Sequence, residues 1–276
     1  MYHFFSSITF LFLIPLTLFS NDELYTVNFD CVIQPSRIAE VGSSAVGIIN
    51  DIKVDRNDDI KRGSVIAILN NTTEKAKVDV AKKRALMQSK IKLSKINLAL
   101  AKREQQRVQK AFNRGSASAH DLDIADTELL LSKVKKLQAI EENQLAKKEL
   151  VHAQSVLAQR TVHAPFSGVI VERHKEVGEH IDTEAIVTLA QIDPLYVEVI
   201  LPISKLGLVS KGMQAQVSCT SLKECKRWVA TVEHVDKVMD AASGTFGVRL
   251  LLPNPKHEIP AGIRSDLKFL LPTPKK

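Results

Sequence analysis

Residues 47–69 read GIINDIKVDRNDDIKRGSVIAIL, and residues 168–190 read GVIVERHKEVGEHIDTEAIVTLA. The two stretches align without a gap at a constant offset of 121 residues, and most of their apolar positions coincide. Asn57 lies opposite Gly178, which fits a turn with positive φ, where glycine is best and asparagine next. One copy of such a repeat cannot bury its apolar face alone. We therefore expect the two copies to close on each other as one small β-domain that is split in the sequence.

Each copy has the pattern of short strands. In the first copy, an apolar run at residues 48–54 precedes a polar turn at 55–59, and a second run follows at Val65–Leu69. This pattern resembles the flattened β-sandwich of lipoyl and biotinyl carrier domains, in which two quasi-symmetric halves pack face to face. A carrier holds its modified lysine in a tight hairpin between the halves. Here residues 72–159 replace that hairpin and no MKM motif is present, so we do not expect a carrier.

The segment between the copies has a helical composition. Neither glycine nor proline occurs from Thr73 to Phe112 or from His120 to Ala158, and strong helix formers dominate the first run. Asn113–Ser116 breaks the pattern. We expect an antiparallel helical hairpin, about 60 Å long at 1.5 Å per residue. Thr72 or Thr73 is expected to cap the first helix.

Seven-residue spacing predicts a coiled-coil seam along each arm. The expected seam residues are Leu86, Leu93, Ile96 and Leu100 on the first arm and Leu130, Leu137 and Val151 on the second. The arms also differ in charge. Residues 74–114 hold thirteen Lys/Arg against three Asp/Glu, and residues 120–158 hold five against seven. This difference favours pairing within the hairpin and between neighbouring hairpins, although a solvated basic face would also account for most of these charges.

A split lipoyl-like domain with an inserted hairpin resembles the periplasmic adaptor proteins, also called membrane fusion proteins (HlyD-like). The resemblance covers residues 25–272. Adaptors that contact an outer-membrane channel share a tip pattern of Arg, then Leu four residues on, then Ser seven further on. In RVQKAFNRGSASAHDLD, Arg107 and Ser118 match, while Ala111 holds the Leu position with Phe112 beside it. The resemblance implies that these four residues form a channel-docking tip.

The same resemblance implies a function. It indicates an adaptor subunit that bridges an inner-membrane RND-type efflux transporter to an outer-membrane channel protein in a tripartite efflux pump, assembled as a homo-oligomeric ring of six. The alternative is an adaptor for an ABC or major-facilitator export system, held by an uncleaved N-terminal anchor. The expected location is the periplasm, associated with the inner membrane through the transporter. At the tip, the alternative to docking is that Arg107 pairs with Asp121 or Asp123 and only stabilises the turn.

The amino-terminal segment is apolar. Residues 4–19 carry no charge, and polar residues follow Ser20. This pattern predicts a cleaved signal peptide over residues 1–20, although Lys and Arg are missing from its start. The apolar run is short for a membrane span of about 20 residues. An uncleaved anchor stays the alternative.

The carboxy-terminal part alternates apolar and polar residues between turns, which predicts a small antiparallel β-barrel at residues 193–272. A short helix is expected at Ser204–Ser210. The predicted fold is therefore mixed α and β. It consists of a lipoyl-like barrel-sandwich domain in two halves (24–71 and 160–192), a coiled-coil hairpin (72–159) and the barrel, with no residues for a membrane-proximal domain.

The sequence carries no signature of catalysis. Nucleophile-elbow, P-loop, HExxH, CxxC and dinucleotide motifs are missing, and the eight histidines show no metal spacing. We expect no enzyme, no catalytic residues, no cofactor and no metal. Nucleic-acid binding, which pI 9.2 formally invites, is opposed by the export signal and the lack of stacking aromatics on the arms. Cys219 and Cys225 could form a disulfide, which would leave Cys31 outside the pair; all three could instead be reduced.

Overall fold

The computed structural model describes residues 25–218 and 227–271. They divide into two compact units, one built from residues up to Ser36 and from Ile192 onward, the other from Arg37–Gln191. Two long strands, β1 (Tyr25–Gly42) and β8 (Ala185–Pro202), contribute to both units.

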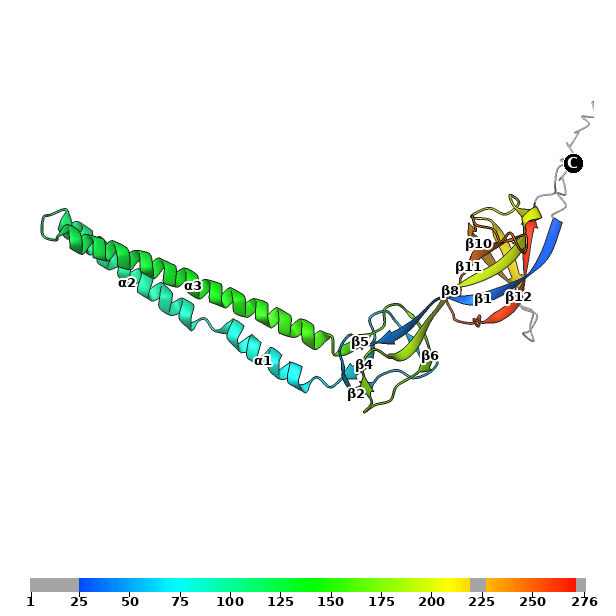
Figure 1. The fold of residues 1–276 in the computed structure, drawn as a ribbon, viewed down its shortest axis with the longest axis horizontal. Coiled ribbons are helices and arrows are strands. Elements are labelled where there is room, and N and C mark those ends of the chain that lie inside the picture. The colour runs from blue at the N-terminus through cyan, green and yellow to red at the C-terminus, as the bar shows by residue number, and fades with distance from the viewer. Residues whose placement is uncertain (1–24, 219–226, 272–276) are drawn as a thin grey trace, which may run out of the picture. The chain divides into compact units, whose positions relative to one another are not determined.

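The first unit is a barrel, which confirms the prediction for the carboxy-terminal part. Its remaining strands are β9 (Gln214–Ser218), β10 (Arg227–Val235), β11 (Thr245–Leu252) and β12 (Ile263–Leu271). Within the described residues the order is β1-β12-β9-β10-β11-β8, and pairing of β1 with β8 closes six strands into a barrel (Figure 1).

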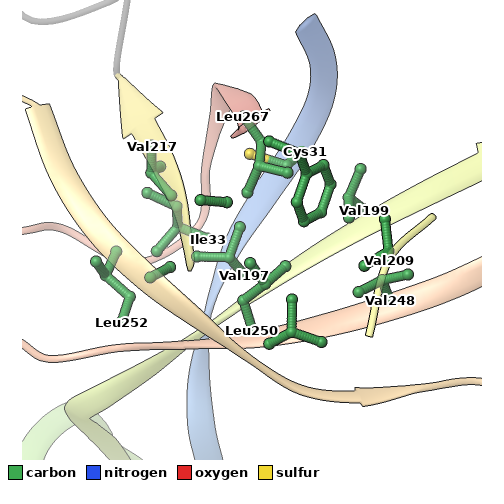
Figure 2. Close-up of a cluster of buried hydrophobic side chains, with 14 of the residues drawn as sticks. Cys31, Ile33, Val197, Val199, Val209, Val217, Val248, Leu250, Leu252 and Leu267 are labelled. Atoms are coloured by element: carbon green, nitrogen blue, oxygen red, sulfur yellow. The ribbon is translucent and has the colours of Figure 1, made fainter. Parts of the chain in front are cut away.

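The barrel interior is filled by alternate residues of its strands. On β8, Leu195, Val197, Val199 and Leu201 are each at most 1% exposed, as expected for a strand with one face toward a core. Figure 2 shows these side chains meeting those of β1, β9, β11 and β12. The thiol of Cys31 lies in this core and donates to the carbonyl oxygen of Ser265 at 3.1 Å.

The helix expected at Ser204–Ser210 is wrong. The chain forms only one 3₁₀ turn, η1 (Ile203–Lys205). Leu206 is extended and Gly207 has a φ of +84°, so the helical path ends after the first turn.

The β-part of the second unit consists of short strands from both repeat copies. They are β2 (Gly47–Ile52), β3 (Asp59–Ile60), β4 (Val65–Leu69), β5 (Thr161–His163), β6 (Gly168–Arg173) and β7 (His180–Ile181). One sheet has the order β5-β4-β2-β7, and β3 and β6 continue the sheet of β8. Each sheet therefore mixes strands from both copies, which confirms that the copies close on each other.

Equivalent positions of the two copies exchange equivalent hydrogen bonds. The Asn57 amide donates to the Ile170 carbonyl, and the Gly178 amide donates to the Ile49 carbonyl, both at 2.8 Å. The strand pairs match as well, with β2 on β7 and β3 on β6. Asn57 and Gly178 have φ values of +69° and +93°, as predicted for this turn.

The helical insert is a hairpin, but its first arm is divided. Helices α1 (Thr72–Leu86) and α2 (Ser89–Phe112) lie beside a single long helix, α3 (Ala119–Ala158) (Figure 1). At the break, Met87 is extended and the Asn143 side chain of α3 donates to the carbonyls of Ala85 and Met87. None of the helices in the described ranges is long and apolar enough to cross a membrane.

The predicted N-cap is also wrong. Asn71 occupies the N-cap position of α1 without a side-chain capping bond, so neither Thr72 nor Thr73 fills that place. The amide of Thr72 instead receives a bond from the neighbouring loop, in which the Asn70 side-chain oxygen accepts it at 3.2 Å. The loop before α1 therefore satisfies one of the amides that a capping side chain would otherwise take.

The seam between the arms is one residue away from the predicted one. Leu86, Leu93 and Leu100 are 70%, 60% and 57% exposed, and the predicted residues of α3 are similarly exposed. The seam of α2 consists of Ile91, Ser94, Leu98, Ala101, Gln105 and Val108, and that of α3 of Leu122, Ala125, Leu129, Ser132, Lys136, Ala139, Asn143, Ala146, Leu150, Ala153 and Leu157. Many of these residues are small, so the helices approach closely and the bulky leucines lie outside.

Candidate functional site

The tip of the hairpin is a tight turn between α2 and α3. The amide of Gly115 donates to the Phe112 carbonyl, and the amide of Ser116 donates to the Ala111 carbonyl, each at 2.9 Å. Gly115 has a φ of +72°. This pair of bonds around a left-handed glycine is the Schellman arrangement that ends many helices. It confirms the break predicted at Asn113–Ser116.

Ser118 begins α3. Its hydroxyl donates to the Asp121 carboxylate at 2.6 Å and accepts from the Asp121 amide at 3.1 Å, while the Ser118 amide donates to the same carboxylate. The hydroxyl bond holds the pKa of Asp121 below its usual value. Ser118 thus has a structural use, and its place as a docking residue stays a prediction. Ser-x-x-Asp before a helix is a sequence signature of such a cap, which the sequence reasoning overlooked.

Arg107 lies one turn before the tip and is exposed. Its guanidinium pairs with Glu104 of the same helix at 2.8 Å, so the expected pairing with Asp121 or Asp123 is wrong. The side chains of Arg107 and Glu104 are 75% and 51% exposed, and exposed pairs of this kind contribute roughly 0–1 kcal/mol. The guanidinium has five N–H donors, and one such pair leaves several of them for another acceptor.

The other two predicted tip residues differ in exposure. Phe112, the last residue of α2, is 38% exposed. Ala111 is half-buried beside the turn. The apolar surface that the tip offers therefore comes from Phe112 rather than from the residue at the Leu position of the adaptor pattern.

At the opposite end of the hairpin, Arg160 joins the helices to the β-domain. One nitrogen of its guanidinium donates to the Val46 carbonyl at 2.7 Å, and another donates to Glu74, in the first turn of α1, at 2.9 Å. The side chains of Arg160 and Glu74 are 21% and 10% exposed. A Cβ added to Gly47 would lie 2.7 Å from the same guanidinium, so the glycine leaves it room.

Two electrostatic effects act on Glu74. A hydrogen bond at its own backbone amide, and then the charge and hydrogen bond of Arg160, lower the pKa of this carboxyl. Sequence reasoning missed this root cluster. The only signal was a pair of opposite charges at the two ends of the insert, which many exposed pairs also show.

Three predictions lie outside the described residues. They concern the signal peptide, the pairing of Cys219 with Cys225, and with it the redox state of these two cysteines. Mass spectrometry of the unreduced protein would detect the linked peptide.

Two family models cover most of the chain. Residues 37–191 match a CzcB-like barrel-sandwich hybrid domain, and residues 194–270 match a CusB-like β-barrel domain. The chain is 24% identical over 208 residues to the pyoverdine export membrane fusion protein PvdR of Pseudomonas aeruginosa, which covers 74% of this chain and 53% of PvdR. It is 22% identical over 224 residues to the cobalt-zinc-cadmium resistance protein CzcB of Cupriavidus metallidurans, covering 80% of this chain and 40% of CzcB.

The fold is shared with a solved structure. MacA from Actinobacillus actinomycetemcomitans superposes with a TM-score of 0.75 at 17% identity, over 89% of this chain and 78% of MacA. The chain spans about half the length, or less, of PvdR and CzcB. Because the barrel-sandwich model alone matches more than half of the sequence, the chain belongs to the membrane fusion proteins, the periplasmic adaptors of efflux pumps.

Proposed function

We propose that this protein is the adaptor subunit of a tripartite efflux pump and couples an inner-membrane RND-type transporter to an outer-membrane channel. The hairpin carries this proposal. Its tip is closed by a Schellman turn and a capping box, and its root is held to the β-domain by Arg160. A long, two-ended element of this kind serves to connect two binding partners, and no chemistry is required of it.

The match of the barrel to a CusB-like model, whose name refers to RND systems, supports the choice of transporter class. The similarity to CzcB and PvdR supports an export role. Those two relatives are named for different cargoes, so the proposal concerns coupling and assigns no substrate.

The proposed adaptor lies in the periplasm and is associated with the inner membrane through its transporter. It assembles as a ring of six, because one slender hairpin covers only part of a channel mouth. Its parts are the two lipoyl-like halves (24–71 and 160–192), the hairpin (72–159) and the barrel (193–272). Crosslinking in membranes that contain both partners should give a ladder up to hexamer, and monomer alone would contradict the ring.

Channel docking is proposed for the tip through Arg107, with Phe112 as the apolar contact and Ala111 and Ser118 shaping the turn. Arg107→Asp should abolish efflux and crosslinking to the channel, while protein level and Tm stay nearly unchanged, because the residue is exposed. Arg103→Asp, one turn earlier on α2, makes the same charge change and should leave efflux intact. Normal efflux in Arg107→Asp, or equal loss in both variants, would rule out docking by this residue.

N-terminal sequencing of the exported protein separates this proposal from the alternative. Cleavage after Ser20 supports an adaptor held only through its transporter. An intact amino terminus would support an anchored adaptor for an ABC or major-facilitator exporter.

A further inference from the structure

The hairpin carries apolar rows outside its buried seam. Five residues that each precede a seam position by one lie on the same side of the hairpin. They are 47% to 61% exposed and comprise Leu93, Leu100, Ile124, Leu131 and Leu145. We call this side the leucine face. Both helices contribute to it, since the Lys90 ammonium of α2 pairs with Glu142 of α3 across it at 2.9 Å.

Two hollows open on the leucine face. One, of about 330 Å³, is lined by Ala101 and Ala125 together with Val108 and Ile124. The other, of about 230 Å³, is lined by Ser94 and Ala139 beside Leu93. Leucines that alternate with hollows over small residues form the surface into which side chains of a facing helix insert in a coiled coil.

The opposite side of the hairpin has a different character. Its residues follow each seam position by one, and among them are Lys92, Lys95, Lys102, Leu130, Lys133, Leu137, Lys147 and Val151. We call it the lysine face. Leu130, Leu137 and Val151 are 55% to 61% exposed there, so this side also offers apolar knobs at heptad spacing.

The two faces have opposite net charge. The lysine face carries five lysines against Asp123 and Asp126, and is therefore positive. The leucine face carries five carboxylates against three basic side chains, and is negative. Its carboxylates are Glu104, Asp121, Glu128, Glu142 and Glu149, and its basic residues are Lys90, Arg107 and Lys135. Each face therefore complements the other in charge and repels a copy of itself.

We propose that the leucine face of one hairpin packs on the lysine face of the hairpin of a second copy of this chain, with both tips at the same end. Because the two faces differ, the contact is heterologous, and each added copy leaves one face of each kind open until a ring closes. The parallel orientation and the closure rest on the adaptor role proposed above. The inference assigns the residues of a hairpin–hairpin contact, in addition to any contact through the β-parts.

The apolar part is tested with the full-length protein by sedimentation velocity and native mass spectrometry. The triple variant Leu93→Ser/Leu100→Ser/Leu131→Ser should weaken self-association about tenfold. Its Tm should stay unchanged because the three residues are exposed. The matched control is Ile96→Ser/Val134→Ser, at two positions 63% and 55% exposed that point away from both faces. It should associate like the wild type. Equal effects of the two variants would overturn the proposal.

Charge reversal tests the pairing of unlike faces. Lys95→Glu/Lys102→Glu makes both faces negative, and Glu128→Lys/Glu149→Lys makes both positive, so each variant alone should associate about tenfold more weakly. An equimolar mixture of the two should recover wild-type assembly, because every contact can then join opposite charges. A mixture that stays dissociated overturns heterologous packing.

A third outcome concerns the channel. If the triple leucine variant assembles normally but no longer crosslinks to the channel, the leucine face binds the channel and the inference is wrong. In that case the adaptor role would still stand, because it is tested separately by the efflux of Arg107→Asp.

Discussion

The two copies of the repeat have the same backbone bonds but different neighbours. Gly47 and Gly168 occupy equivalent positions, each at the start of a strand that pairs with the other copy. At Gly168 an added Cβ would lie 2.1 Å from the Ala190 carbonyl oxygen, which belongs to the backbone of β8. At Gly47 it would meet the end of the Arg160 side chain instead. One ancestral pattern thus serves sheet packing in one copy and hairpin attachment in the other.

The strongest test of this difference is Gly168→Ala. The backbone of β8 cannot move aside without disturbing the sheet, so we expect a loss of about 3 kcal/mol or more in the free energy of unfolding. Urea denaturation followed by circular dichroism measures it. A loss below that of Gly47→Ala would show that the two positions are wrongly ranked.

Removing the charge of Glu74 should affect the attachment of the hairpin in a pH-dependent manner. The folded-state pKa of Glu74 is lowered, so its stabilising contribution is present above the pKa of the unfolded chain and is lost as pH falls through the folded value. Glu74→Gln should therefore lower the urea midpoint at pH 7 and have a smaller effect at pH 3. Glu142→Gln, in an exposed pair, is the control and should change the midpoint less at pH 7. A pH-independent effect at Glu74 would contradict the ion pair.

Gly47→Ala should have a milder effect than Gly168→Ala. The guanidinium of Arg160 is the far end of a flexible side chain, so it can shift away from the new methyl group at the expense of its bond to Val46. We expect a loss of about 1 kcal/mol. The same urea series measures it. The pH dependence of stability should also weaken, as in Glu74→Gln, if the displaced guanidinium leaves Glu74 as well.

The smallest effect is expected where the copies differ least. Asn57→Gly brings the first copy to the residue found at Gly178. The positive φ favours glycine, but the added freedom of the unfolded chain offsets that gain, so the change should stay within about 0.5 kcal/mol. Gly178→Asn is the reciprocal variant, and its Tm should move equally little. A large shift in either would show that the turns are not equivalent.

Sequence reasoning succeeded where backbone conformation is written into single residues, and failed where alternatives have the same period. Asn57 and Gly178 indicated the turn because few residues accept a positive φ. Leu93 and Ser94 both recur at seven-residue spacing along α2, so period alone cannot identify the buried row. Large apolar residues were assumed to be inside, whereas close helix packing buried the small ones.

Long-range contacts were the other blind spot. The break at Met87 contains neither glycine nor proline, and it is bridged by Asn143, 56 residues away. Arg160 contacts Glu74 across 86 residues. No local pattern reports such pairs. For the same reason the tip, whose contacts are local, could be outlined from the sequence and the root could not.

The divided first arm has a mechanical consequence. Helix α3 is an unbroken 40-residue rod that leads directly to Arg160, whereas α1 and α2 are separate segments joined at Met87 and Gln88. A force applied at the tip is therefore borne along its axis by α3, while bending is taken up at the joint of the other arm. The hairpin is a strut with one stiff rail and one articulated rail, and it yields sideways more easily than it shortens.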